Sequence, residues 1–408
     1  MPVRKEQEKM SDTLHDLYPK FPKNFPLPML LDASTGTSLM RDGMPAGSCT
    51  EKWVLDHPEI LKNIQTSYEE SGSDALYTPT FGANRPTLAR EGFDNPDEMN
   101  RELASLSVGK ARFTGGDMSP TGLFIEPFGD TPFDEVVAVY REQAKVLDEA
   151  GVDFFVPETN ISLQEARAAV IGIREVSDKP IFVTMTVDNE GMTLSGDSLV
   201  SCLLSLAELG INAFGTNCSQ GPDGMLPLLQ GLAPYSLALG IPLIAKPNAG
   251  MPHEEPDGSR HFDLTADDFA KYVPSFLESG IPIIGGCCGT DAEFIKKTRE
   301  SMDAHAGKLD YSGIEKADTD SMACTNRETV IPDIESLGDP IPADENFFDE
   351  ASMASGDFVY VSLPDEIAAD TFIENAPMLT LPCVVTGDPT AIAKAKRYYN
   401  GKLLVVEE

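Results

Sequence analysis

Three cysteines lie in glycine-rich segments that each follow a short apolar run. Cys287 and Cys288 are adjacent within Ile-Pro-Ile-Ile-Gly-Gly-Cys-Cys-Gly-Thr at residues 281–290. Cys218 lies within Asn-Ala-Phe-Gly-Thr-Asn-Cys-Ser-Gln-Gly-Pro at residues 212–222. Three thiolates at the ends of two strands form a soft, open site that zinc usually occupies, with a fourth position left for a substrate. The sequence therefore predicts zinc ligands at Cys218, Cys287 and Cys288, with catalysis at the same residues.

The paired cysteines can share one site only under a geometric condition. Adjacent side chains on a strand point to opposite faces, so the backbone must leave the pleat where Cys287 and Cys288 lie. The flanking glycines permit this, because glycine accepts backbone angles that other residues avoid. The alternative interpretation is a pair of buried structural cysteines or a strained vicinal disulfide. It would require three separate glycine-flanked thiols to coincide.

Two carboxylates also follow apolar runs. Asp32 ends the first run and precedes a loop of small residues, 33–37, of a kind that exposes backbone N–H groups to an anion. Glu158 follows the apolar run 152–156 and precedes a predicted helix. Asp32 has the alternative role of a turn or helix cap, and Glu158 that of a cap on the helix that follows it. We interpret Lys246, the basic residue at the end of another run, as a solvated loop lysine.

The elements that position these residues alternate along the chain. Apolar segments typical of strands lie at 29–32, 74–80, 111–118, 152–156, 179–187, 211–215, 241–245 and 281–284. Segments typical of helices lie at 49–71, 96–110, 131–150, 162–176, 199–209, 221–239, 264–280 and 291–301. This alternation predicts an α/β fold, a parallel (β/α)8 TIM barrel. The carboxyl ends of barrel strands form the catalytic face, so the cysteines and carboxylates are expected to lie around one site.

The sequence divides into four parts. An N-terminal extension, 1–28, contains a short predicted helix from Glu6 to Leu17 and then several prolines. The barrel is expected over 29–302, and an acidic linker or wrap over 303–356. A small C-terminal α/β appendage is expected over 357–408. Its predicted strands are 358–363, 382–386 and 402–406, and its predicted helices are 365–374 and 389–399. We expect the part after residue 303 to pack on the outer helices and to leave the barrel mouth open.

Composition limits the partners. The 408 residues carry a formal net charge of −35, which repels nucleic acid and anionic membrane surfaces. No apolar run approaches the ~20 residues of a membrane span. Seven cysteines without a regular framework, and without a recognisable signal peptide, predict a cytoplasmic protein with reduced thiols. We therefore expect neither a nucleic-acid nor a membrane partner.

The motifs around the three cysteines resemble the zinc site of the homocysteine S-methyltransferase family. Gly-Gly-Cys-Cys-Gly-Thr and Gly-Thr-Asn-Cys-Ser carry the resemblance, which runs from about Leu30 to about Glu300. The family includes betaine–homocysteine methyltransferases and the first module of cobalamin-dependent methionine synthases. Its first loop reads Asp-Gly-Ala-Met-Gly-Thr. This chain keeps the Asp, the second Gly and the Thr, but it has Ala33 and Thr35 in place of the first Gly and the Met.

The resemblance implies roles for several residues. Asp32 and Glu158 would bind the amino group of L-homocysteine, and backbone amides at Ala33 and Ser34 would meet its carboxylate. Asn248 lies in Pro-Asn-Ala-Gly-Met-Pro, which resembles a turn that shapes the substrate mouth in the family.

The implied reaction is zinc-dependent methyl transfer to the thiol of L-homocysteine, which gives methionine. Residues 190–197 and 217–222 look more like the methionine synthase module than the betaine enzyme. We therefore expect a free-standing methionine synthase subunit that takes its methyl group from methylcobalamin on a separate corrinoid protein. A small donor, betaine or S-methylmethionine, is the alternative within the enzyme class. A non-catalytic barrel that binds zinc or thiols is the alternative of another class.

Overall fold

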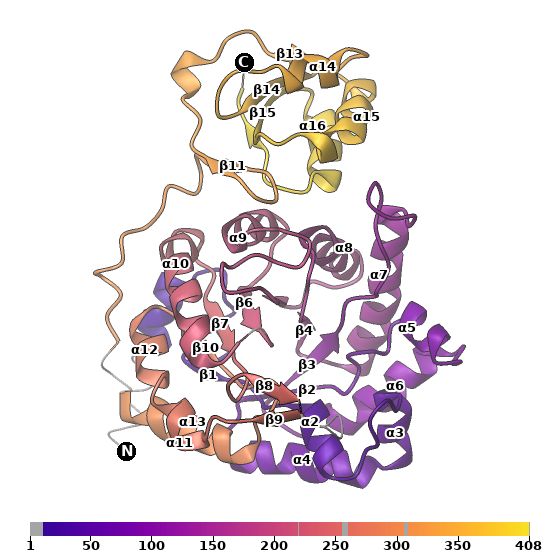
Figure 1. The fold of residues 1–408 in the computed structure, drawn as a ribbon, viewed down its shortest axis with the longest axis vertical. Helices are drawn as coiled ribbons and strands as arrows, with labels where there is room; N and C mark the ends of the chain where they lie inside the picture. Colours follow the sequence, from indigo (N-terminus) through magenta and orange to yellow (C-terminus); the bar gives the residue numbers. More distant parts are fainter. Residues whose placement is uncertain (1–10, 219, 255–259, 306–308, 408) are drawn as a thin grey trace.

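The computed structural model describes residues 11–218, 220–254, 260–305 and 309–407, which form a barrel with a smaller α/β unit on one side (Figure 1). Within these ranges, the barrel strands are β1 (Met29–Leu30), β2 (Ala75–Tyr77), β3 (Phe113–Met118), β4 (Phe154–Pro157), β5 (Phe182–Met185), β6 (Ala213–Asn217), β7 (Leu243–Lys246) and β10 (Ile283–Ile284). The predicted α/β fold with parallel strands is confirmed.

The strands pair side by side in a ring, and every ladder between them is parallel. One sheet has the order β2-β3-β4 and the other the order β5-β6-β7-β10-β1. A parallel bridge between Phe155 and Ile181 connects β4 to β5. A hydrogen bond of 2.7 Å from Asp74 N to Leu30 O connects β2 to β1. All strand carboxyl ends therefore meet at one end of the barrel, where active sites of such folds lie.

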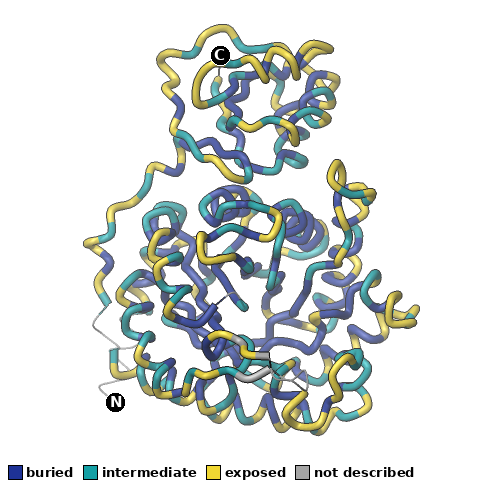
Figure 2. The backbone as a smooth tube through the Cα atoms, in the orientation of Figure 1, coloured by how far each residue is buried: buried dark blue, intermediate teal, exposed yellow. Residues whose placement is uncertain are grey.

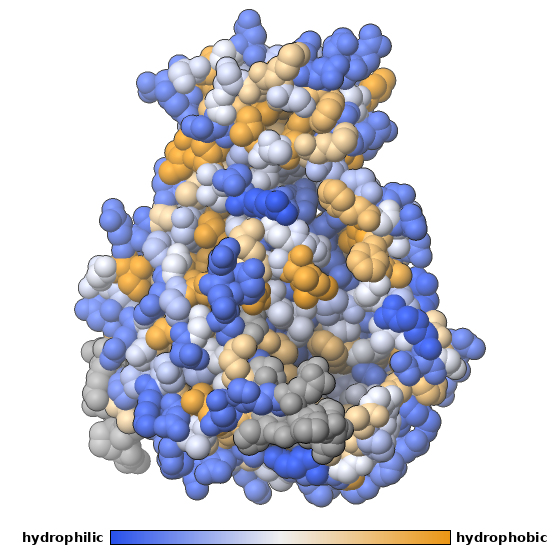
Figure 3. Space-filling model, viewed as in Figure 1, coloured by the Kyte–Doolittle hydropathy of each residue, from blue (hydrophilic) through white to orange (hydrophobic). Residues whose placement is uncertain are grey.

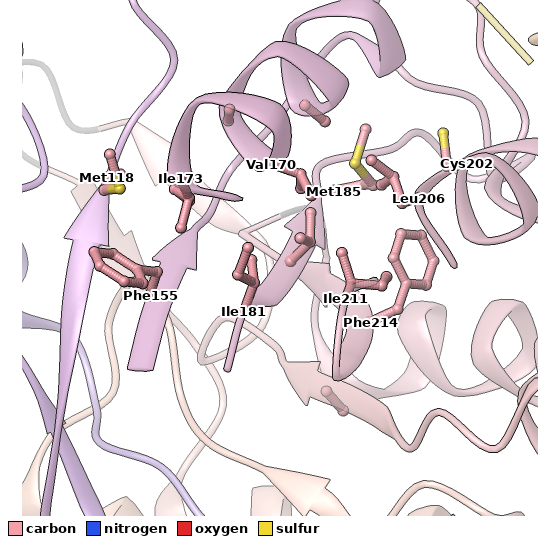
Figure 4. Packing of buried hydrophobic residues seen from close by; sticks show 14 of the residues in the cluster. Met118, Phe155, Val170, Ile173, Ile181, Met185, Cys202, Leu206, Ile211 and Phe214 are labelled. Atoms are coloured by element: carbon pink, nitrogen blue, oxygen red, sulfur yellow. The ribbon is translucent and has the colours of Figure 1, made fainter. Parts of the chain in front are cut away.

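Helices surround the strands. In the described part of the chain they are α2 (Thr35–Arg41), α3 (Thr50–Asp56), α4 (Pro58–Glu70), α5 (Arg85–Arg90), α6 (Pro96–Ser107), α7 (Phe133–Ala150), α8 (Leu163–Arg174), α9 (Leu199–Glu208), α10 (Pro222–Leu239), α11 (Ala266–Ala270), α12 (Val273–Glu278) and α13 (Ala292–His305). Apolar residues on the outer face of the strands pack against these helices. Figure 4 shows this for Phe155 and Phe214, which lie between the strands and α8 and α9.

Three local predictions about the barrel need correction. The single helix predicted over 49–71 is two helices, α3 and α4, because the residue before Pro58 disfavours helical angles. The helix predicted over 264–280 is likewise divided, into α11 and α12. An antiparallel hairpin, β8 (Pro252–Glu254) and β9 (Arg260–Phe262), follows β7 and was not predicted. It is short and lacks an apolar run.

The N-terminal extension closes the amino end of the barrel. Residues 11–17 are helical, and the part of the predicted helix before residue 11 lies outside the described residues. The rings of Phe21 and Phe25 are buried among the first residues of the strands. Phe25 stacks on Phe113 with 4.3 Å between ring centroids, and Phe21 stacks on Phe182 at 5.4 Å. The extension therefore completes the barrel core.

Replacing Phe25 by alanine should destabilise the protein strongly, because the cavity would lie between strands that cannot collapse around it. The expected loss is about 3–5 kcal/mol in the free energy of unfolding, measured by urea denaturation. Phe124→Ala is the matched control, because that ring is 78% exposed. The control should stay within about 0.5 kcal/mol of the wild type. Equal stability of the two variants would contradict the closure of the barrel by Phe25.

The C-terminal unit has its own parallel sheet and its own core. Its strands are β13 (Ile341–Pro342), β14 (Val359–Leu363), β15 (Cys383–Gly387) and β16 (Leu404–Val405), paired in that order. Its helices are α14 (Phe347–Ser352), α15 (Glu366–Asn375) and α16 (Pro389–Tyr398). The unit therefore includes β13 and α14, which lie in the segment expected to be a linker or wrap. The sheet and helices bury a cluster around Phe347 and Phe372.

The C-terminal unit is attached to the outer helices of the barrel. Arg167 on α8 is 2% exposed, and its guanidinium donates to the carbonyl oxygen of Lys396 at 2.6 Å. A short hairpin, β11 (Ala323–Cys324) and β12 (Thr329–Val330), precedes the unit, and Cys324 packs against α9. Residues 309–322, which precede this hairpin, run along the outside of the barrel with many exposed residues (Figure 2). None of the described helices is both long and apolar enough to cross a bilayer.

Candidate metal centre

The structure brings the three predicted thiols together at the carboxyl ends of the strands. Cys218 follows the last residue of β6, and Cys287 and Cys288 follow β10. The sulfur atoms of Cys218 and Cys288 are 3.5 Å apart, and all three sulfurs lie within 4.8 Å of one another. A zinc–sulfur distance of about 2.3 Å in tetrahedral geometry places sulfurs about 3.8 Å apart. The donor set therefore fits a zinc ion, and each of the three cysteine residues is partly exposed.

The backbone turns sharply at each cysteine segment. Cys218 has φ 59°, the left-handed region that non-glycine residues rarely adopt. The flanking glycines were predicted to permit unusual backbone angles, but Gly285 and Gly286 are required because there is no space for a side chain. A Cβ on Gly286 would lie 2.3 Å from Thr290 Oγ1. The positive φ in this segment, 81°, belongs to Gly289. These turns release both cysteines of the pair from the strand and let their thiols reach Cys218.

The thiols influence one another strongly. Hydrogen bonds with Cys287 and Cys288 raise the pKa of Cys218 well above its ordinary value. The physical cause is that neighbouring sulfurs cannot all be ionised so close together unless a cation lies between them. A metal ion would reverse this balance, because coordination deprotonates a thiol. Asn217 Nδ2, 3.9 Å from Cys287 Sγ, is held in place by the bond that Asn217 Oδ1 accepts from Thr184 Oγ1 at 2.9 Å.

A buried cluster of charges lies beside the thiols. Asp32 Oδ1 accepts from the ammonium group of Lys246 at 3.0 Å, and the two side chains are 2% and 4% exposed. The same ammonium lies 3.7 Å from Glu158 Oε2 and 3.8 Å from the centroid of the Tyr77 ring. The interpretation of Lys246 as a solvated loop lysine is therefore wrong. Ile244, two residues earlier on β7, faces the barrel interior, and Lys246 shares that face.

The burial of this cluster shifts its ionisation. Burial raises the pKa of Glu158 to about 7, although the nearby ammonium of Lys246 acts in the opposite direction. Burial acts to lower the pKa of Lys246, but Asp32, Tyr77 and Glu158 together raise it well above its ordinary value. Lys246 is therefore held as a cation.

The structural alternatives for the two carboxylates do not apply. Ser34, rather than Asp32, caps α2 and accepts from Thr37 N at 3.2 Å. Ser162, rather than Glu158, caps α8.

The remaining predicted site residues lie around the same end of the barrel. Ala33 is buried, and Ser34 N donates to Thr290 Oγ1 at 3.4 Å, which places the first loop beside the cysteine pair. Asn248 is buried and donates to the carbonyl oxygen of Cys218 at 3.1 Å. Its Oδ1 atom has no hydrogen-bond partner among the described residues. All eight predicted positions therefore meet at the carboxyl ends of the strands.

Comparisons with known proteins agree with this geometry. The family model for homocysteine S-methyltransferase matches residues 29–302, which is most of the chain. The chain belongs to the homocysteine S-methyltransferase family.

Two methionine synthases are similar to this chain over part of their length. Methionine synthase from Mycobacterium tuberculosis is 29% identical over 299 residues, and the match covers 67% of this chain and 24% of the relative. Methionine synthase from Mycobacterium leprae is 30% identical over the same length and coverage. The chain therefore spans about a quarter of the length of these relatives.

Solved structures support the fold. The oxidized form of the homocysteine methyltransferase MmuM from Escherichia coli matches with a TM-score of 0.56 at 20% identity, and the match covers 68% of this chain and 96% of that one. Its metallated form matches with a TM-score of 0.54 at 20% identity, covering 66% and 96%. At this level of identity the likeness concerns the fold.

Two charged residues at the centre of this family member were not predicted as site residues. Lys246 was noted at a strand end but was expected in solvent. Asp117, the residue before the last of β3, is 8% exposed. An acidic residue within the run Phe113–Met118 was the available signal, because unpaired carboxylates are seldom buried inside strands.

Proposed function

We propose that this chain catalyses methyl transfer to the thiol of L-homocysteine, giving methionine, and that it does so with zinc held by Cys218, Cys287 and Cys288. The single observation that carries the proposal is the convergence of three thiols beside a buried charge cluster at the carboxyl ends of the barrel strands. The names of the relatives and the metallated form of the Escherichia coli enzyme support it. Three ligands would leave a fourth coordination position for the acceptor sulfur.

The protein residues would prepare the acceptor for displacement. When bound, zinc with three thiolate ligands would lower the pKa of the acceptor thiol and keep its sulfur electron-rich. Asn217 would steady Cys287 through its contact with that sulfur. The sulfur–carbon bond then forms as the bond between donor and methyl carbon breaks, and the donor keeps the electron pair. The thiol proton passes to solvent, so no general base is required at the sulfur.

Polar groups around the thiols would orient the amino acid. Glu158 Oε2 has no hydrogen-bond partner within the described residues, so it is available to a substrate ammonium. The loop of Ala33 and Ser34 would offer backbone amides to the substrate carboxylate, as the resemblance implies. Asn248 would contribute its Oδ1 atom at the mouth. Asp32 belongs to the same cluster through its ion pair with Lys246.

The mouth of the barrel supports a protein-borne methyl donor. Large apolar side chains are exposed on the loops that follow β2, β3, β5 and β7: Phe81 (39%), Phe124 (78%), Phe128 (84%), Leu194 (83%) and Met251 (56%). Figure 3 shows apolar patches between hydrophilic ones on this side of the molecule. Exposed apolar patches rimmed by polar groups are typical of interaction sites. We therefore favour methylcobalamin on a separate corrinoid protein, with this chain acting as a free-standing methionine synthase subunit.

The direct test combines binding and turnover. Zinc-loaded protein should bind L-homocysteine by calorimetry, and it should form methionine from homocysteine when methylcobalamin supplies the methyl group. Methionine would be measured by mass spectrometry with a labelled methyl group. A zinc-loaded protein that binds homocysteine but forms no methionine with any methyl donor would instead favour a non-catalytic thiol-binding barrel.

Glu158→Gln should keep zinc but weaken homocysteine binding. The change replaces a charged acceptor by a neutral one that also carries N–H donors facing the ammonium. Losing a charged hydrogen bond costs roughly 1.5–3 kcal/mol, which corresponds to about a tenfold or greater rise in Kd. Calorimetry and metal analysis on the same sample would separate the two effects. Glu175→Gln, on a partly exposed carboxylate paired with Arg141 on the outside of the barrel, is a control that should leave Kd unchanged. Unchanged affinity in Glu158→Gln would remove Glu158 from the site.

A further inference from the structure

The charge cluster beside the thiols holds more carboxylates than the family motifs account for. Asp32, Asp117 and Glu158 lie near one ammonium group, that of Lys246, so the carboxylates outnumber the cation by two. All four groups are buried or nearly so. Burying like charges without partners is costly, so such a cluster is expected to have a cationic ligand.

Asp32 is already engaged by the chain itself. Its Oδ1 atom accepts from Lys246 at 3.0 Å, and its Oδ2 atom accepts from Tyr77 N at 2.8 Å. Its charge is therefore matched by an internal ammonium, and each of its oxygens has a partner. A substrate ammonium would have to compete with Lys246 for this carboxylate.

Asp117, unlike Asp32, has a carboxyl oxygen without a hydrogen-bond partner among the described residues. The side chain is 8% exposed, and its Oδ1 atom has no hydrogen-bond partner in the described ranges. Phe113 faces the barrel interior at the start of the same strand, and Asp117, four residues later, shares that face. Burial and the neighbouring Glu158 raise the pKa of Asp117 well above its ordinary value. The ammonium of Lys246 acts in the opposite direction, but Asp117 makes no ion pair within the described residues.

Asp117 and Glu158 lie on neighbouring strands, with Glu158 two residues further toward the carboxyl end in the register of the two strands. Asp117 pairs in register with Val156, two residues before Glu158, and Glu158 N donates to Met118 O at 3.1 Å. Glu158 Oε2 also has no hydrogen-bond partner among the described residues and lies 3.7 Å from Lys246. Two carboxyl groups, each with an acceptor atom that lacks a hydrogen-bond partner among the described residues, therefore face the interior on neighbouring strands, one inward-facing position apart.

We propose that Asp117, together with Glu158, binds the ammonium group of homocysteine in this chain. An ammonium has three donors and one positive charge, so it can donate a hydrogen bond to the unpartnered oxygen of each carboxyl group and offset the excess of carboxylates over the single ammonium of Lys246. Asp32 remains paired with Lys246 in this arrangement, which differs from the role that the family resemblance implies for Asp32. The proposal rests on the proposed function, because it assumes homocysteine as the ligand.

The test compares two thiols that differ only in the amino group. L-homocysteine and 4-mercaptobutyrate, which lacks that group, are titrated into the zinc-loaded full chain by calorimetry. The wild type is expected to prefer homocysteine by tenfold or more. Asp117→Asn should reduce this preference at least tenfold while keeping zinc content and 4-mercaptobutyrate affinity, which also verifies folding. Should Asp117→Asn fail to fold, Asp117→Ser is used and the same affinity ratio decides.

Asp153→Asn is the matched control. Asp153 lies just before β4, at the amino end of the same pair of strands, and its carboxylate accepts from Thr114 N at 2.7 Å. The Asp153→Asn variant removes one negative charge from this strand pair without touching the site. It should therefore keep the full preference for homocysteine over 4-mercaptobutyrate. A preference that persists in Asp117→Asn overturns the inference. Failure of the zinc-loaded wild type to bind either thiol would instead overturn the proposed function.

Discussion

Replacing Cys218, Cys287 or Cys288 by serine is expected to remove most of the bound zinc and nearly all methyl transfer. Wild-type protein should carry about one zinc per chain, because the three sulfurs lie within 4.8 Å of one another and would supply three ligands of a single tetrahedral site. A serine hydroxyl stays protonated near neutral pH and is a harder ligand than a thiolate, so each substitution removes one ligand of three. Metal analysis of the purified variants, with zinc per chain as the measured quantity, checks this.

Cys49→Ser is the matched control for the three zinc-site variants. Cys49 is partly exposed like the site cysteines, but its thiol donates to Glu51 Oε2 at 3.6 Å, away from the cluster. This variant should keep its zinc and its activity. Stoichiometric zinc in all three site variants would show that other residues hold the metal.

Methylcobalamin is expected to serve as methyl donor, and turnover should be faster when a corrinoid protein presents it. The three cysteine residues are partly exposed at the carboxyl end of the barrel, and loops that follow β2, β3, β5 and β7 carry exposed apolar side chains. Methyl-tetrahydrofolate alone should give no methionine, because the described residues provide a single barrel whose mouth holds the thiols. Methionine formation with each donor in turn, at equal zinc content, measures the difference. Turnover with betaine or S-methylmethionine, and none with methylcobalamin, would contradict this donor.

Phe128→Ser tests the docking part of the same prediction. Its ring is 84% exposed on the loop that follows β3, so the variant should slow transfer from the corrinoid protein and leave transfer from free methylcobalamin unchanged. Met353→Ser is the control, since Met353 is 76% exposed but lies just after α14 in the C-terminal unit. Equal effects of the two substitutions on transfer from the corrinoid protein would contradict a docking surface that includes the loop of Phe128.

The sequence predicted the barrel because its evidence is local and repeated. Each strand is a short apolar run, and each following helix has one apolar face, so the alternation is visible without knowledge of distant contacts. The thiols were predictable for a similar reason, since cysteines next to glycines after a strand have few structural explanations. The hairpin after β7 was missed because its pairing carries no such pattern.

Lys246 shows why the rest of the site was not predictable. A lysine at a strand end is solvated unless a partner meets it, and the partner here is Asp32, 214 residues away in sequence. The role of Asp117 was equally hard to predict from the sequence, because its neighbour Glu158 lies on the next strand. The N-terminal extension likewise gave no sign of its packing, because its aromatic residues find their contacts on strands far along the chain. Such contacts depend on the closed barrel as a whole.

The aromatic closure of the barrel has a consequence for biosynthesis. Phe25 leaves the ribosome early, but its partners Phe113, Phe154 and Phe182 follow much later. At about 5–20 residues per second, the roughly 160 residues between Phe25 and Phe182 take about 8–30 s to translate. During that interval Phe25 has only Phe21, and later Phe113 and Phe154, of the ring partners that it contacts in the folded barrel. The amino end of the barrel therefore cannot be closed until the middle of the chain has been made, and during this delay the exposed rings are a site where a chaperone could bind the growing polypeptide.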